Sequence, residues 1–191
     1  MQSVDPATET RIDSFDRHDE TAVEERLERA QRGFETWREQ PITDRQALLA
    51  GVSDVLEANE SEYARTMTAE MGKPIEQARA EVQKCARVCE YYAEQAGTFL
   101  QDDRVAVEPD AKTFVAYEPF GPVLAVMPWN YPFWQVFRFA APALAAGNVC
   151  LLKHAPNVQG CAEAIADVFE AAGFPEYALQ TLRVADETVA D

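Results

Sequence analysis

Lysine is scarce in this 191-residue chain, where only four of the 17 basic residues are Lys. Asp and Glu together number 33, so the formal net charge is −16. A chain this acidic would repel a phosphate backbone or an anionic membrane surface, and we therefore predict no nucleic-acid partner and no membrane partner. Salt screens the self-repulsion of such a surface, so the composition also favours a halophilic type of protein.

Cysteine occurs only four times, and the first residues contain neither the basic segment nor the apolar run of a secretory leader. Both features predict a protein of the reducing cytoplasm. Cys85 and Cys89 lie on the apolar face of a predicted helix, where core packing is favoured because two further metal ligands are missing. Cys150 and Cys161 have no evident base beside them. We predict no metal site and nominate no cysteine as a nucleophile.

Glycine-rich phosphate motifs are absent, since the sequence contains neither Gly-x-Gly-x-x-Gly nor a P-loop. A long membrane-spanning run is absent too. Residues 119–137 carry no charge, but they contain four prolines that would break a spanning helix. We interpret this stretch as buried core.

Helical periodicity dominates the first hundred residues. The first predicted helix opens with capping-box spacing between Thr21 and Glu24 and places Leu27, Phe34 and Trp37 on its apolar face. Three more helices follow: one from about residue 43, one that ends at about residue 70 before a Gly stop, and one over about residues 75–100.

Strand patterns begin after residue 101. Residues 105–107 and 113–117, around Pro109 and Asp110, predict a short β-hairpin. Residues 122–127 are apolar on both faces, as in a covered parallel sheet. The following segments alternate between helix and strand, over residues 132–145, 149–152, about 156–173 and 179–184. This order predicts an α/β fold in which a helical N-terminal region leads into a half-built parallel sheet.

The two strand ends carry the candidate functional residues, because ligands bind at the carboxyl ends of parallel strands. Asn130 follows the first strand, where its amide is either an oxyanion donor or a turn former. Lys153 ends the second strand and either meets a ribose or phosphate group or is simply solvated. His154 has no evident Asp or Ser partner, which favours packing over acid–base chemistry.

Four linked motifs around these ends resemble the aldehyde dehydrogenase family. They are Glu118-Pro119-Phe120-Gly121-Pro122, Pro128-Trp129-Asn130-Tyr131-Pro132, Ala141-Pro142-Ala143-Leu144-Ala145-Ala146-Gly147-Asn148 and Leu152-Lys153. The resemblance covers the whole chain and, within the family, points to the succinate-semialdehyde dehydrogenases. It implies a partial, Rossmann-like NAD(P)-binding domain over residues 1–103 and 119–191, an oligomerisation hairpin over residues 104–118, and no catalytic domain.

The resemblance also implies residue roles. Asn130 would stabilise the oxyanion of the reacting aldehyde. Met127, Pro128, Trp129, Lys153 and Pro156 would line the cofactor site. Many members that prefer NAD carry a Glu where this chain has Pro156, so we expect NAD or NADP, with NADP slightly favoured.

The substrate is expected to be a small aldehyde, such as succinate semialdehyde. Tyr131, Gln135 and Arg138 share one helical face and correspond to positions that line the family's substrate tunnel. Arg138 would hold the far carboxylate of the substrate; the alternative is that it pairs with a structural acid.

The family's nucleophilic Cys and general-base Glu match nothing in this chain. We therefore expect the N-terminal part of an NAD(P)-dependent aldehyde dehydrogenase that is inactive alone, prone to aggregate through its open sheet, and a homo-oligomer when complete. The alternative is a non-catalytic truncated remnant, or an interaction module that pairs with full-length subunits through its hairpin.

Overall fold

The computed structural model of the chain describes residues 1–105 and 112–190. The helices are α1 (Glu20–Trp37), α2 (Ile42–Ala58), α3 (Glu60–Met71), α4 (Ile75–Phe99), α5 (Pro132–Ala145) and α6 (Gln159–Ala171), with a short 3₁₀ helix, η1 (Glu187–Ala190). The strands are β1 (Gln2–Val4), β2 (Arg11–Ser14), β3 (Asp103–Val105), β4 (Thr113–Val115), β5 (Pro122–Met127), β6 (Val149–His154) and β7 (Leu179–Thr181).

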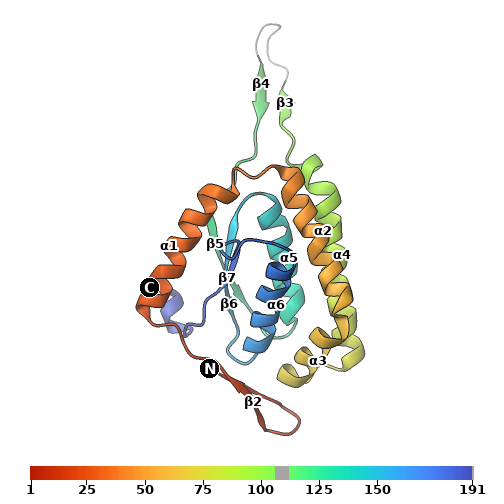
Figure 1. Ribbon diagram of the computed structural model, residues 1–191, viewed down its shortest axis with the longest axis vertical. Helices are drawn as coiled ribbons and strands as arrows, with labels where there is room; N and C mark the ends of the chain where they lie inside the picture. Colours follow the sequence, from red (N-terminus) through yellow and green to blue (C-terminus); the bar gives the residue numbers. More distant parts are fainter. Residues whose placement is uncertain (106–111, 191) are drawn as a thin grey trace.

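A three-stranded parallel sheet lies at the centre of the molecule, in the order β5-β6-β7 (Figure 1). Its register pairs Ala125 with Leu152 and Leu152 with Thr181. Helices α5 and α6 connect successive strands and pack against the sheet. The expected α/β fold, in which a helical region precedes parallel strands, is confirmed.

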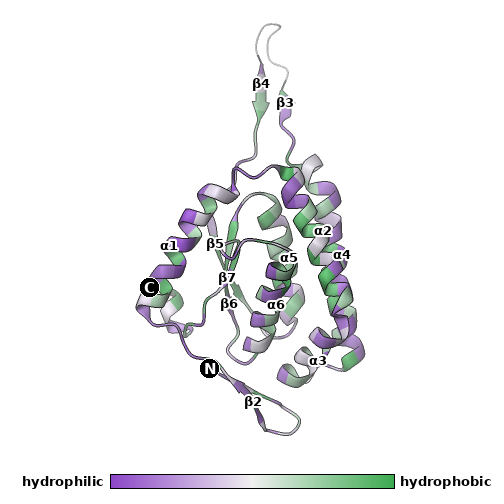
Figure 2. Cartoon of the chain, in the orientation of Figure 1, coloured by the Kyte–Doolittle hydropathy of each residue, from purple (hydrophilic) through white to green (hydrophobic). Residues whose placement is uncertain are grey.

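Helices α2, α3 and α4 form a helical layer outside the crossover helices α5 and α6. Helices α2 and α4 pack on each other and on α5, α3 packs on α6, and α1 lies against β5 and β6 on the opposite side of the sheet (Figure 1). Apolar residues concentrate in the central strands and α5, whereas α1 and α4 are polar along their outer faces (Figure 2). No helix in the described part of the chain is long and apolar enough to cross a membrane.

Helix α1 begins two residues earlier than the predicted cap at Thr21 implies. The carboxylate of Asp19 accepts a hydrogen bond from the backbone N–H of Ala22 at 2.9 Å and so caps the helix. The predicted cap at Thr21 is wrong because Asp19 supplies the acceptor first. Trp37 is buried as predicted, but Leu27 is 48% exposed.

The N-terminal segment contradicts the expectation that the first hundred residues are purely helical. Strands β1 and β2 form an antiparallel hairpin with a bulge after Ser3. Strand β2 is fully exposed and β1 buries only Ser3, so no alternating apolar pattern marks them. The buried Ser3 hydroxyl donates a hydrogen bond to the Glu70 carboxylate at 2.5 Å, which fixes the hairpin to α3.

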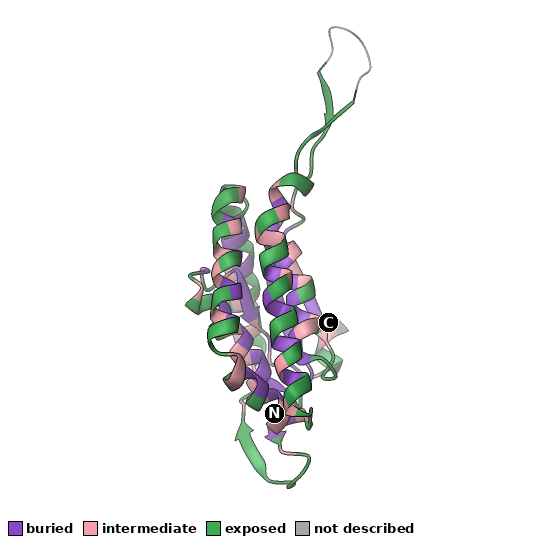
Figure 3. Ribbon diagram, turned by 90° about the vertical axis from the view of Figure 1, so that its right-hand side faces the viewer, coloured by how far each residue is buried: buried purple, intermediate pink, exposed green. Residues whose placement is uncertain are grey.

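The one predicted hairpin is present in β3 and β4, which pair antiparallel with Arg104 opposite Phe114. The ends predicted at Ala106 and Val107, and the turn at Pro109 and Asp110, lie outside the described residues. The hairpin projects away from the helices and is exposed along its described length (Figure 3).

Strand β5 differs from the expectation of a strand covered on both faces. Ala125 is buried beneath α5, but Leu124 and Val126, on the opposite face, are 45% and 53% exposed. Within the described residues, α1 covers mainly β6 on that side, where all six residues are buried. The apolar sequence of β5 therefore marks a face that is open in this structure.

Candidate functional site

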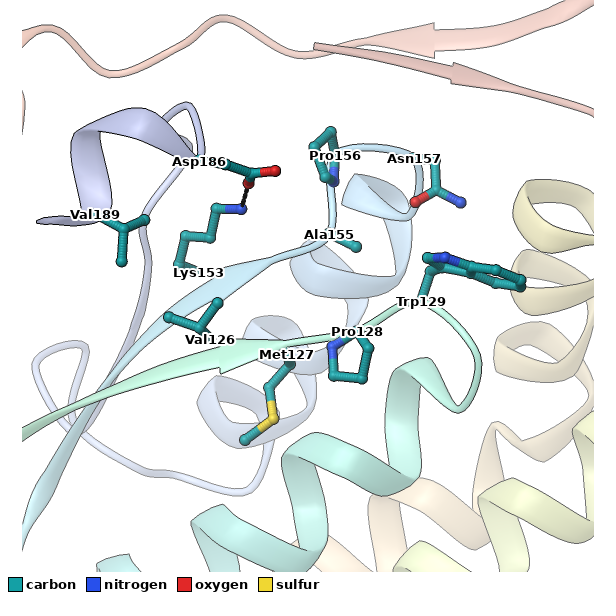
Figure 4. Close-up of a pocket in the computed structure, with 10 residues that line it drawn as sticks. All are labelled: Val126, Met127, Pro128, Trp129, Lys153, Ala155, Pro156, Asn157, Asp186 and Val189. Carbon is teal, nitrogen blue, oxygen red and sulfur yellow. Dashed lines mark hydrogen bonds and ion pairs between the residues drawn. The ribbon is translucent and has the colours of Figure 1, made fainter.

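A cavity of about 440 Å³ opens at the carboxyl ends of β5 and β6 (Figure 4). The strand ends and the loops that follow them supply most of its wall, and the segment leading into η1 supplies the rest. Its lining residues are Val126, Met127, Pro128, Trp129, Lys153, Ala155, Pro156, Asn157, Asp186 and Val189. The wall is largely apolar, with few polar groups that can orient a ligand.

All five residues predicted to contact a cofactor line this one cavity. Met127, Pro128 and Trp129 follow one another at the end of β5, and Trp129 is half-exposed. Lys153 and Pro156 lie at the end of β6, which pairs with β5 so that Met127 is opposite His154. Parallel pairing of the two strands is what brings the two sequence motifs together.

Lys153 is buried, although a lysine at a strand end is ordinarily solvated. Its ammonium group forms an ion pair with the carboxylate of Asp186, which is itself largely exposed (Figure 4). Asp186 was not foreseen as part of the site. Asp186 reaches the cavity because the chain turns back toward it between β7 and η1. The sequence of this short connection does not predict that course.

His154 is buried at the end of β6 and uses both ring nitrogens. Nδ1 accepts the backbone N–H of Ala155 at 2.8 Å, so Nε2 carries the proton and donates to the carbonyl of Pro132 at 2.9 Å. Burial lowers the pKa of His154 to about 4, against the opposing effect of the hydrogen bond to Pro132. The neutral His154 ring, with both nitrogens hydrogen-bonded, links the end of β6 to the start of α5. This agrees with the prediction from the sequence that His154 serves packing rather than acid–base chemistry.

Asn130 and the three predicted substrate residues are not part of the wall of this cavity. Asn130 is exposed in the turn between β5 and α5. Tyr131 occupies the N-cap position of α5 without a side-chain capping hydrogen bond, Gln135 is half-buried in the first turns, and Arg138 is exposed one turn later. Asn130 directly follows Trp129 of the cavity wall, whereas Tyr131 lines a separate cavity of about 240 Å³ with Gln77, Ala80, Glu81 and Lys84 of α4. Among the residues that the structure describes, no carboxylate pairs with Arg138.

The four cysteines are unpaired in disulfides and buried in this structure. Burial raises the pKa of Cys150 to about 12 and raises the pKa of Cys85 and Cys89 as well. Cys161 lies at the start of α6, where a helix N-terminus can lower a thiol pKa, but burial and the neighbouring Glu70 raise it instead. Core packing of Cys85 and Cys89 is confirmed.

Buried charges behind the site were also missed from the sequence. The Glu81 side chain on α4 is 1% exposed and forms an ion pair with the equally buried Lys73. Its Oε1 accepts the backbone N–H groups of Phe133 and Trp134 at 3.0 and 2.9 Å. A signal did exist, because Glu81 lies within the apolar stripe between Ala78 and Cys85.

Comparison with known proteins identifies the family. The model of the aldehyde dehydrogenase family matches residues 1–191. The chain belongs to the aldehyde dehydrogenase family. The resemblance seen in the four sequence motifs is therefore confirmed over the full length of the chain.

Similar members of the family are succinate-semialdehyde dehydrogenases. A probable succinate-semialdehyde dehydrogenase [NADP(+)] of Synechocystis sp. is 51% identical over all of this chain and 43% of its own length. A succinate semialdehyde dehydrogenase [NAD(P)+] of Escherichia coli is 45% identical over 91% of this chain and 37% of its own length. The chain thus spans about two fifths of the curated relatives that it matches.

Solved structures agree with this assignment. A succinic semialdehyde dehydrogenase from Streptococcus pyogenes, crystallised with NADP+, superposes with a TM-score of 0.94 at 30% sequence identity. The match covers 99% of this chain and 42% of that chain. The arrangement of helical layer, hairpin and parallel sheet is therefore that of the corresponding part of this family member.

Proposed function

We propose that this chain is the N-terminal part of an NAD(P)-dependent dehydrogenase that oxidises succinate semialdehyde, or a similar small aldehyde with a distal carboxylate, to the carboxylic acid. The observation that carries the proposal is that the exposed Asn130 directly follows Trp129 in the wall of the cavity that contains Lys153, at the start of the helix on which Arg138 is exposed. The names of the relatives support the choice of substrate.

The cavity fits the adenosine part of a dinucleotide. Lys153 is a buried cation whose ammonium lies at a largely apolar wall, where it can donate hydrogen bonds to ribose hydroxyls or pair with a phosphate. Pro156 brings no carboxylate that would repel a 2′-phosphate, and the Asp186 carboxylate in the same cavity is paired with Lys153, so NADP is favoured slightly over NAD. Such a cofactor, when bound, supplies hydride acceptance; this chain's residues bind and orient it.

Two side chains of this chain would act on the aldehyde itself. The amide of Asn130 would donate a hydrogen bond to the carbonyl oxygen as negative charge develops on it. The guanidinium of Arg138, unpaired among the described residues, would hold the distal carboxylate with two parallel hydrogen bonds. The four thiols are buried with raised or strongly raised pKa values, so we assign the nucleophile to a part of the enzyme other than these residues.

The test is a comparison of two substrates in the complete enzyme that contains this chain. Arg138→Ala should lower kcat/KM for succinate semialdehyde at least about tenfold and leave an uncharged aldehyde of similar length within about twofold, since one charged hydrogen bond contributes about 1.5–3 kcal/mol. Arg38→Ala, at an exposed arginine that pairs with Glu39 and Glu118, is the control. An equal loss on both substrates would overturn the carboxylate role.

A second function is favoured by the hairpin of β3 and β4. Val105, Phe114, Val115 and Tyr117 are each at least 44% exposed on a projecting two-stranded element. We infer that this apolar edge pairs with a second subunit, either within a homo-oligomer or, if the chain acts as an interaction module, with a full-length relative. Phe114→Asp should shift the native mass toward the monomer, and an unchanged mass would exclude the hairpin as the contact.

A further inference from the structure

The start of α5 is held by the helical layer through a buried ion pair. Glu81 of α4 accepts two backbone N–H groups at the first turn of α5, from Phe133 and Trp134. Its second carboxylate oxygen pairs with Lys73, which lies in the connection between α3 and α4. Both side chains are almost fully buried, so neither contact is exchanged for solvent.

Lys73 of this ion pair also contacts Tyr131, the last residue of the turn between β5 and α5 that contains Asn130. The Lys73 ammonium lies 3.9 Å from the centre of the Tyr131 ring, over its face. On the next residue, the Pro132 carbonyl accepts the hydrogen bond from the His154 ring. Tyr131, Pro132, Phe133 and Trp134 are therefore anchored one after another.

Asn130 immediately precedes this anchored run. Upstream, the turn is fixed by β5, whose last residue, Met127, pairs with His154 on β6. Only Pro128 and Trp129 separate that fixed strand from Asn130. Because Asn130 is exposed and has no anchor of its own among the described residues, the contacts of the following residues determine where its amide lies.

We propose that Lys73 and Glu81 are positioning residues, which orient Asn130 toward the reacting aldehyde by fixing the first turn of α5 from the helical layer. The inference rests on the proposed role of Asn130 and adds two residues far from it in sequence. Neither Lys73 nor Glu81 contacts the substrate. Their effect is on how often the amide of Asn130 occupies its working position.

A matched control exists in the same layer. Glu70, at the end of α3, is equally buried and accepts the backbone N–H groups of Gly160 and Cys161 at 2.8 and 2.7 Å at the start of α6. Glu70→Gln therefore makes the same chemical change at the other crossover helix, away from Asn130. A merely structural role for the buried carboxylates predicts the same outcome for both variants.

The first measurement is hydrogen–deuterium exchange on the complete enzyme that contains this chain, which needs no turnover. Glu81→Gln should speed exchange of the backbone amides in the segment 129–134, at all its residues except Pro132, by about tenfold, because local opening then costs less free energy. Glu70→Gln should speed residues 159–162 instead and leave 129–134 unchanged. Unaltered exchange over 129–134 in Glu81→Gln would overturn the proposal.

The second measurement is steady-state kinetics in the complete enzyme. Glu81→Gln should lower kcat at least about tenfold while KM for the aldehyde stays within about twofold, the pattern of a lost transition-state interaction. Glu70→Gln should keep kcat within about twofold. If Glu81→Gln fails to fold, Lys73→Gln, which leaves Glu81 bound to the helix amides, is expected to show the same split.

The outcomes separate the two proposals. Faster exchange over 129–134 with unchanged kcat would overturn the positioning role and leave the proposed function intact. A wild-type complete enzyme without activity on any aldehyde would overturn the proposed function, and the effect of Lys73 and Glu81 on the turn would still be decided by exchange alone.

Discussion

The buried Lys153 ammonium pairs with the exposed Asp186 carboxylate, 33 residues further along the chain. A sequence motif supplies the lysine, whereas only the fold supplies its partner. The carboxylate that many NAD-preferring members carry three residues after this lysine is replaced by Pro156, yet Asp186 brings a carboxylate to the same cavity from another segment.

Removing that carboxylate should change cofactor choice. Asp186 would repel a 2′-phosphate group near Lys153, so Asp186→Ala should raise the ratio of kcat/KM for NADP to that for NAD about fivefold, which corresponds to about 1 kcal/mol for a screened pair of charges. Glu187→Ala, one residue on, is the control because Glu187 does not line the cavity. An equal change of the NADP-to-NAD ratio in both variants would show that the effect comes from the net charge of the protein and not from the position of Asp186.

Asn130 should matter for turnover far more than for folding. Loss of one oxyanion donor costs about 10²–10³ in kcat, so Asn130→Ala in the complete enzyme should fall in that range. Its side chain is exposed, and the unfolding temperature should stay the same within error. Asn59→Ala, between α2 and α3, serves as the remote control. A loss in kcat of less than about threefold would contradict the oxyanion role.

Stability should fall as pH drops from 6.5 to 4. Burial lowers the pKa of His154 from 6.5 to about 4. Between pH 6.5 and pH 4, His154 therefore binds a proton in the unfolded chain but not in the folded chain. The free energy of unfolding should decrease by up to about 3 kcal/mol over this window from His154 alone. Denaturant titrations at several pH values would measure it. His154→Gln should have a shallower pH dependence, and an unchanged slope would contradict the assignment.

Two helix-interior glycines should respond in opposite ways to alanine. A Cβ on Gly33 would lie 2.4 Å from the Tyr177 ring, whereas one on Gly51 would lie 3.4 Å from its nearest neighbour, the carbonyl oxygen of Ala172. Gly33→Ala should therefore lower the free energy of unfolding by about 1–3 kcal/mol, and Gly51→Ala should be neutral or stabilising. Adding Tyr177→Ala to Gly33→Ala should recover part of the loss, which a double-mutant cycle would show.

Salt should stabilise this chain. A net charge of −16 repels itself in dilute buffer, and molar salt shortens the range of that repulsion. We expect the unfolding temperature to rise between 0.1 and 2 M KCl. An equal unfolding temperature at both concentrations would exclude a halophilic type of surface.

The central strand and helix were predictable from the proline and glycine residues that bound them in the sequence. Residues 122–127 and 132–145 match β5 and α5 at both ends, because prolines open each element and Gly147 follows the helix. The hairpin of β1 and β2 was not predictable, because exposed strands with mixed polar residues carry no alternating pattern.

The residues of the site likewise fall into those that the sequence predicts and those that it does not. Asn130 and Lys153 are found by motif, since the motif is local in sequence. Asp186, Lys73 and Glu81 reach the site through tertiary packing of segments that lie elsewhere in the chain, which a single sequence does not encode locally. A charge within an apolar helical stripe, as at Glu81, is the one clue that was available.

The carboxylates of Glu70 and Glu81 have a consequence for anion recognition. In many α/β proteins the free N–H groups at a crossover helix bind the phosphates of a nucleotide. Here the backbone donors of Gly160, Cys161, Phe133 and Trp134 already face internal counter-anions from the helical layer. The N-termini of α5 and α6 are therefore already neutralised and do not bind a pyrophosphate at this sheet edge. The charge of such a pyrophosphate must be balanced by cationic side chains, solvent or groups outside α5 and α6.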